Sequence, residues 1–249
     1  MARNPSKLYQ FHVANLREIE LAISHTARLS RSAIASRDPQ RSLRSLLWLY
    51  SFLIGAWAEC RLRKLLHEEY GFNDREREQI LLKSTQLEQW QDTVDSAFRK
   101  HHKIKKASLN EKIIGVAHAA RRSALLDALN SDLRIVIEIR NKLAHGQWVY
   151  PLNSDGTNVD PDKYRLINQE NLLSLMFKFA LLGHIADAVH DLVLSPPTFE
   201  RDFELHFRNI FQVRTNLQTR KYAKYELSLI RKRQKARGIR NASIQTDKK

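Results

Sequence analysis

Apolar residues recur at three- and four-residue intervals along most of this chain, which is the pattern of amphipathic helices. One such segment covers residues 6–35 and includes Leu8, Phe11 and Ile19, and a more apolar one follows over 41–70. Five further segments share the periodicity: 74–100, 108–130, 131–146, 168–194 and a last one from 198 towards the C-terminus. The pattern predicts an all-α fold, a bundle of about six or seven helices.

Polar residues with capping chemistry mark where several of these helices should begin. Ser108 and Glu111 have the spacing of a capping box. Ser131 or Asp132 is placed to cap the following helix, and Asn168 to cap the one after the non-helical stretch. None of the six prolines falls inside a helical pattern, so the prolines delimit the helices and do not interrupt them.

Residues 147–167 lack the helical pattern and are rich in turn-forming residues. Short segments with β-like composition, 148–150 and 164–167, lie on either side of the Asp155-Gly156 pair. We therefore expect one short irregular or β-hairpin insertion in an otherwise helical domain.

The positive charge is concentrated at the C-terminus. The chain has a net charge of +15, and residues 214–249 hold 12 of the 42 Lys and Arg residues but only two acids. This divides the chain into a helical domain over 1–213 and a basic C-terminal helix and tail over 214–249. A cationic segment attracts phosphate backbones by releasing counterions, so Arg231, Lys232 and Arg233 are candidate RNA contacts. The alternative is a terminus that only aids solubility.

Other chemistries have little support in the sequence. A single cysteine, Cys60, excludes an internal disulfide framework. The longest apolar run, 46–58, is shorter than the roughly 20 residues that a membrane span needs, and the N-terminus lacks a secretory signal. We expect a soluble cytoplasmic protein with no membrane association. We also expect no cofactor and no metal, because His101 and His102 lie among lysines and because residues 184–191 fit a solvated helix face.

The helix over 131–146 has an unusual distribution of polar residues. At 100° per residue, Arg134, Glu138, Asn141 and His145 form one polar stripe. Arg140 lies about 140° away from His145, on an apolar flank, where an unpaired charge is costly.

Glu59 is a candidate partner for this helix, because it also lies on an apolar helix face. We expect it to orient Arg140 or His145 across the bundle. The alternative is a local pair between Glu59 and Arg63, four residues further along the same helix.

The segment Arg140-Asn141-Lys142-Leu143-Ala144-His145-Gly146 resembles the R-N-x-x-A-H form of the motif of HEPN domains. The resemblance extends to the fold class over most of the chain, but its specific residues number only about six. It implies a metal-independent endoribonuclease that acts as a homodimer, in which two motifs meet in one composite site. Arg140, Asn141 and His145 are the residues carried over as catalytic, and Glu59 is a weaker carry-over.

The chemistry of metal-free RNA cleavage suits these residue types. The 2′-OH attacks its own phosphate, which requires a base, an acid and cationic donors for the developing charge. Histidine can serve either proton role, and arginine presents a fixed fork to phosphate oxygens. A dimer would supply two histidines. Because Arg140 and His145 diverge on an ideal helix, their convergence requires a curled Arg side chain, a distorted last turn or the second protomer.

The resemblance also suggests biological roles and partners. The first hypothesis is a toxin or antiphage-defence effector that cleaves RNA, with tRNA as one candidate, under the control of an antitoxin or another regulatory protein. Lys142 and Trp148 are further candidate RNA contacts, Trp148 by stacking on a base, although packing within the insertion would also explain it. The alternative hypothesis is a catalytically silent helical adaptor or RNA-binding module.

Overall fold

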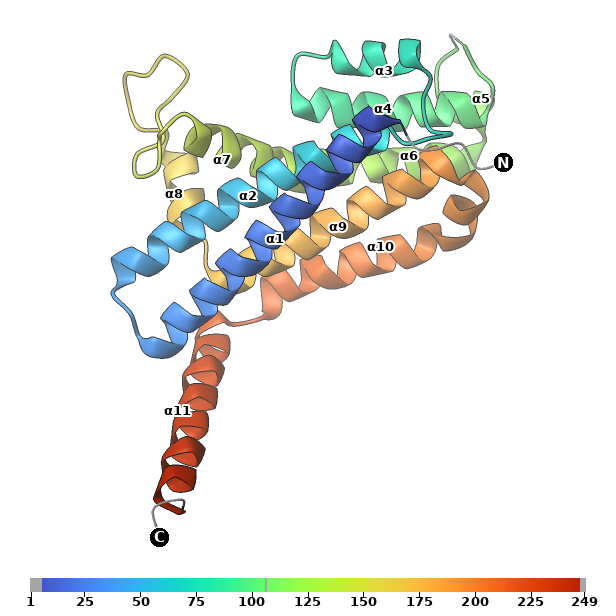
Figure 1. Cartoon of the computed structure of the whole chain (residues 1–249). Helices are drawn as coiled ribbons and strands as arrows, with labels where there is room; N and C mark the ends of the chain where they lie inside the picture. Colours follow the sequence, from blue (N-terminus) through green and yellow to red (C-terminus); the bar gives the residue numbers. More distant parts are fainter. Residues whose placement is uncertain (1–5, 106, 247–249) are drawn as a thin grey trace.

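The computed structural model describes residues 6–105 and 107–246, and this part of the chain folds into helices with no strand (Figure 1). The all-α prediction is therefore confirmed. Helices α1 (Lys7–Ser36) and α2 (Gln40–Leu66) form an antiparallel pair with an extensive contact. Ser6 caps α1 by accepting a hydrogen bond from the backbone N–H of Tyr9, at 3.1 Å.

The single helix predicted over 74–100 is two helices, α3 (Asp74–Leu81) and α4 (Gln86–His101). The division arises because Thr85 starts a new helix. Its hydroxyl accepts from the Glu88 backbone N–H, and the Glu88 carboxylate accepts from the Thr85 N–H, which is a capping box. A capping box also begins α3, between Asn73 and Glu76.

The two helices predicted over 108–130 and 131–146 are in fact one long helix preceded by a single turn. After the short α5 (Glu111–Ile114), α6 (Val116–Ala128) continues through a five-residue π-helix, η1 (Leu129–Leu133), into α7 (Arg134–Ala144). The predicted caps at 108 and 131–132 are therefore wrong. The Ser131 hydroxyl donates to the Asp127 carbonyl as a residue of a helix interior does.

The insertion is shorter and less β-like than its composition predicts. An isolated antiparallel bridge joins Leu152 to Val159 around the predicted Asp155-Gly156 turn. Residues 164–167 are helical, within α8 (Pro161–Gln169), because Asp160 caps that helix and Pro161 occupies its first turn. The next helix, α9 (Leu172–Leu194), accordingly begins with the Asn171–Ser174 capping box and not at Asn168.

Helix α9 is the central helix of the bundle. It contacts α1, α2, α4 and α10 (Pro196–Thr219), and its buried residues include Leu181, Ile185 and Val189 (Figure 1). Among the described residues it is the one helix long and apolar enough to cross a membrane, with a mean hydropathy of 1.6. A core helix of a bundle passes the same test, because it is apolar on nearly every side.

The basic C-terminal segment forms a separate helix, α11 (Tyr222–Thr246), after a break at residues 220–221. Its first turns pack against α1 and α9 through Tyr222, Tyr225 and Leu229. The rest of α11 projects from the body of the bundle (Figure 1).

Candidate functional site

Arg140 lies where α7 crosses α2, and Glu59 of α2 is its partner. Arg140 Nη2 lies 2.6 Å from Glu59 Oε2, with both side chains partly buried. The cross-bundle pairing predicted from the apolar positions of these two charges is therefore confirmed, and the described contacts of Glu59 do not include Arg63. Arg140 Nε is buried without a hydrogen-bond partner. This arginine is thus held rigidly, at the cost of one unsatisfied donor.

Gly55 makes this crossing possible. A Cβ atom built on Gly55 would lie 2.3 Å from the Arg140 Cβ and 2.7 Å from its Cγ. No side chain fits between the two helices at this point, so α2 reaches α7 only with glycine there. The close approach at Gly55 is thus between two helices of the same chain.

Asn141 and His145 extend the site towards the end of α7. The Asn141 Oδ1 accepts a hydrogen bond from Arg140 Nη1 at 3.1 Å, which turns the amide NH₂ group outwards as a donor. His145 caps α7 with its backbone, at φ −87° and ψ 18°, and its side chain is exposed. Gly146 follows with φ +76°, so the chain leaves the helix directly after the motif.

The structure does not join His145 to Arg140. Among the described contacts, the His145 imidazole has no hydrogen bond or ion pair, whereas the Arg140 guanidinium is bonded to Glu59 and Asn141. The predicted motif residues therefore occupy the same end of one helix, with the cation fixed and the imidazole free.

Lys142 and Trp148 have structural contacts in the insertion. The Lys142 ammonium donates to the Leu152 carbonyl, and the Leu152 N–H donates to Gln147 Oε1 at 2.7 Å. Trp148 lies edge-on to Trp48, at 6.4 Å between ring centroids, in a small cluster with Ile139 and Leu143. The side chains of Lys142 and Trp148 thus fix the insertion against α2 and α7.

Two aromatic residues of the insertion face solvent instead. Tyr150 and Tyr164 stack with their ring planes 7° apart, and they are 61% and 40% exposed. Exposed aromatic rings can stack on a base, whereas the Trp148 ring packs against Trp48. The sequence places Tyr150 near the motif, but it gives no indication that Tyr164 joins it.

Lys163 is a neighbour of the site that the sequence did not predict. Its ammonium pairs with Glu138 of the polar stripe, which also lies 3.9 Å from Arg134. Glu138 is therefore neutralised by α8, and the outward-facing part of the stripe near His145 has no acid of its own to repel a phosphate. No sequence pattern could reveal this pair, because residues 147–167 appeared non-helical.

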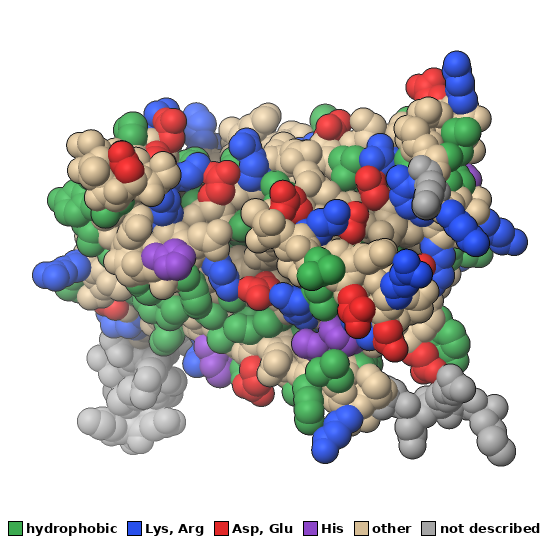
Figure 2. Space-filling view, turned by 90° about the horizontal axis from the view of Figure 1, so that it is seen from above, with side chains coloured by type: hydrophobic (Ala, Val, Ile, Leu, Met, Phe, Trp, Pro, Cys, Tyr) green, Lys and Arg blue, Asp and Glu red, His purple; other side chains and the backbone are tan. Residues whose placement is uncertain are grey.

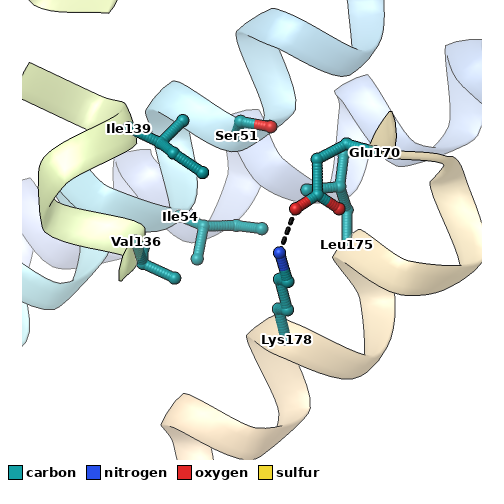
Figure 3. A pocket seen from close by; sticks show the side chains of 7 residues that line it. All are labelled: Ser51, Ile54, Val136, Ile139, Glu170, Leu175 and Lys178. Atoms are coloured by element: carbon teal, nitrogen blue, oxygen red, sulfur yellow. Dashed lines mark hydrogen bonds and ion pairs between the residues drawn. The ribbon is translucent and has the colours of Figure 1, made fainter. Parts of the chain in front are cut away.

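A narrow pocket lies behind α7 but has no room for a nucleotide (Figure 3). Its volume is about 10 Å³, which is space for about one water molecule. Val136 and Ile139 line one side, and Lys178 forms an ion pair with the buried Glu170 on the other. The pocket is a small packing defect. The Lys178–Glu170 ion pair that lines it holds the junction between α8 and α9 beside α7.

The basic residues of α11 are not part of this site. Arg231 and Lys232 are exposed on α11, which projects from the opposite side of the bundle to the end of α7 (Figure 1). Arg233 lies 3.4 Å from the Ser32 carbonyl and so contacts α1. On the face seen in Figure 2, basic and acidic side chains are interspersed.

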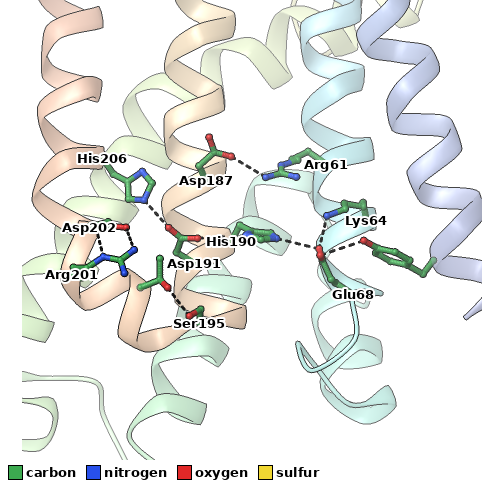
Figure 4. A network of polar contacts seen from close by, with 12 residues as sticks. Arg61, Lys64, Glu68, Asp187, His190, Asp191, Ser195, Arg201, Asp202 and His206 are labelled. Carbon is green, nitrogen blue, oxygen red and sulfur yellow. Dashed lines mark hydrogen bonds and ion pairs between the residues drawn. The ribbon is translucent and has the colours of Figure 1, made fainter. Parts of the chain in front are cut away.

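Asp187, His190 and Asp191 take part in an ion-pair network between α9 and its neighbours, and Asp187 is at the same time exposed, as a solvated helix face predicts (Figure 4). Asp187 pairs with Arg61 at 3.0 Å, His190 with Glu68 at 3.3 Å, and Asp191 with His206 at 2.9 Å. Burial raises the pKa of Glu68, but hydrogen bonds from His190 and Lys64 outweigh this and lower that pKa to about 2. The network therefore serves to hold α2, α9 and α10 together.

Comparison with protein-family models, with curated protein sequences and with solved structures finds no match for this chain. The function is therefore argued from the site itself.

Proposed function

We propose that this protein is a metal-independent endoribonuclease of the HEPN type, which cleaves RNA through attack of a 2′-OH on its own phosphate. One observation supports this above the others. The helix end formed by α7 combines a guanidinium fixed by Glu59, an amide oriented by that guanidinium, and an exposed, unpaired imidazole. These are the groups that metal-free phosphoryl transfer from RNA requires.

Each residue has a distinct role in this proposal. Arg140 stabilises the negative charge on the phosphorane oxygens with the N–H groups that Glu59 and Asn141 do not occupy. Asn141 donates from its amide nitrogen to the phosphate or to the imidazole. His145 takes the 2′-OH proton or protonates the 5′-oxygen leaving group. Glu59 positions Arg140 and does not touch the substrate.

The separation of Arg140 from His145 favours a site shared by two protomers. Each protomer supplies one fixed arginine and one free histidine, and a homodimer would supply both an acid and a base. We therefore expect the full chain to have twice its 29.1 kDa mass in solution by light scattering. The biological setting we propose is a toxin or antiphage-defence effector whose activity is restrained by a partner protein.

The test is cleavage of bulk tRNA and of a mixed RNA pool in excess EDTA. Wild type should cleave and leave 2′,3′-cyclic phosphate and 5′-OH ends, whereas His145→Ala should bind RNA without cleaving it. His25→Ala, which removes an exposed histidine of α1, is the matched control and should cleave normally. Equal cleavage by wild type and His145→Ala would exclude this site. RNA binding without cleavage by wild type would favour a silent adaptor.

A further inference from the structure

Three histidines from two helices meet at the other end of the bundle from the α7 site. His101 ends α4, His102 caps it, and His118 lies in the first turn of α6. Their ring centroids are 4.6 to 5.2 Å apart, and one ring nitrogen from each lies within 4.8 Å of the others. This is the one group of three potential metal ligands found among the described residues.

A carboxylate orients this group. Glu200 Oε1, from the second turn of α10, lies 2.5 Å from His118 Nε2 and 3.8 Å from His101 Nε2. The other oxygen, Oε2, pairs with Arg121, whose guanidinium stacks 5.0 Å above the Phe203 ring. Histidine ligands of metals typically donate their second ring N–H to a carboxylate in this way.

One imidazole nitrogen in the cluster has no partner. His102 Nε2 is buried and makes no hydrogen bond among the described residues. A buried nitrogen without a partner is costly, and a metal ion would satisfy it. Burial and the neighbouring His118 also lower the pKa of both His101 and His102.

The neighbouring positive charges do not exclude a cation. Lysines beside His101 and His102 argue against a metal in the sequence, but the Lys100 ammonium is bonded to the Tyr70 and Gly71 carbonyls. The Glu200 carboxylate offsets the charge of Arg121. The sequence could not reveal the third histidine, because His118 is in a different helix, after the turn at Gly115.

We propose that His101, His102 and His118 bind one Zn²⁺ ion, with Glu200 as the carboxylate that positions His118. Imidazole nitrogen is a preferred zinc ligand, and three such ligands from two helices are sufficient for a protein site. The ion would connect α4, α6 and, through Glu200, α10.

This site is independent of the proposed nuclease. His118 and His145 lie 27 positions apart on one nearly continuous helix, which is roughly 40 Å at 1.5 Å per residue. The two sites can therefore be tested separately, and loss of one does not imply loss of the other.

The experiment is titration of the metal-stripped, untagged full chain with ZnSO₄ by calorimetry, together with thermal unfolding. Wild type should bind one equivalent and unfold at a higher temperature when loaded. His102→Ala and His118→Ala should each weaken binding at least tenfold, and Glu200→Gln about 10- to 100-fold. His25→Ala should bind as wild type does.

Cobalt(II) gives a second readout that does not depend on stability. The wild-type complex should show the visible absorption of a tetrahedral, nitrogen-liganded Co²⁺, and the spectrum should be lost in His102→Ala. If the alanine variants lose helical circular dichroism, Glu200→Gln and the wild-type cobalt spectrum still decide the matter. The proposal would be overturned if wild type did not bind Zn²⁺ stoichiometrically. It would also be overturned if a variant with His101, His102 and His118 all replaced by Ala bound Zn²⁺ as tightly as wild type.

Discussion

Arg140 is held in place by contacts with three residues. Glu59 and Asn141 bond its two terminal nitrogens, and Gly55 admits its Cβ and Cγ atoms. This partly buried charge leaves one nitrogen unsatisfied and needs a specific backbone geometry at Gly55. That cost is understandable if the guanidinium must present its remaining N–H groups at a defined angle.

Gly55→Ala tests this arrangement. The added Cβ overlaps Arg140, so α2 and α7 must separate or the arginine must move. We expect the free energy of unfolding to fall by about 1–3 kcal/mol, as for overpacked cores. Chemical denaturation measures this. Ala56→Ser, on the partly exposed neighbouring position, is the control and should change stability little. If Gly55→Ala were as stable as wild type, α2 and α7 would be able to move apart without loss of stability.

Cys60 reports on the Glu59–Arg140 pair. Burial raises the pKa of the Cys60 thiol, the Glu59 charge raises it further, and the Arg140 charge opposes this. Glu59→Gln should therefore increase the rate of thiol alkylation near pH 8, and Arg140→Gln should decrease it. The rate with iodoacetamide, measured on folded protein, checks both directions. Equal changes in the same direction would indicate altered access to the thiol, not altered charge.

At the scale of helices, the sequence predicts which segments are helical more accurately than it predicts the residues at which the helices begin. Periodicity locates the apolar faces of α1, α2, α9 and α10 because those faces are buried in the chain's own core. Capping residues mislead at Ser131 and Asp132, since buried neighbours such as Leu129 and Leu133 keep the helix continuous. Apolar residues around α7 indicate a central helix, but α9 occupies that place.

The candidate site was predictable in one pairing across helices. Glu59 and Arg140 are both charged residues on apolar helix faces. Each therefore requires a partner of opposite charge, which makes their contact predictable from the sequence. Lys163 and His118 do not require a protein partner, because each side chain is partly exposed and can form hydrogen bonds with water. Their contacts depend on how α8 and α6 are placed, which local patterns do not determine.

The network between α2 and α9 should make stability dependent on pH. The folded-state pKa of Glu68, about 2, lies below its ordinary value, so the ionised form stabilises the fold. That contribution is complete above about pH 4.5 and is lost as the pH falls towards 2. Thermal unfolding between pH 6 and 3 should show a steeper loss for wild type than for Glu68→Gln. Glu69→Gln, at the exposed neighbouring position, should behave as wild type.

For the whole molecule, the proposed nuclease would bind RNA and cleave it with separate regions. The exposed residues Arg231 and Lys232 lie on α11, away from the α7 site, so they would contribute affinity without contributing to chemistry (Figure 1). A long RNA could contact both regions of one protomer, or of two.

Arg231→Gln with Lys232→Gln should weaken RNA binding and reduce its salt dependence, with cleavage chemistry unchanged at saturating RNA. For every phosphate that the variant no longer neutralises, the slope of log K against log salt should fall by about 0.7 for a single strand. Filter binding between 50 and 300 mM salt measures the slope. Lys83→Gln with Arg75→Gln, exposed basic residues on or next to α3, is the matched control. An unchanged slope would remove α11 from the RNA interface.

The π-helix η1 sets the rotational phase between the two halves of the long helix. Its wider turn accommodates an extra residue between α6 and α7. Deleting one residue from 129–133 would therefore restore α-helical winding and leave the phase of α7 relative to α6 nearly unchanged. The same deletion inside α6 would instead rotate α7 by about 100° relative to the residues before the deletion, and Arg140 would turn away from Glu59 although no residue of the motif had changed. A chain of this fold can therefore lose the Arg140–Glu59 pair by a single in-frame codon deletion several helical turns away, but not by one within η1.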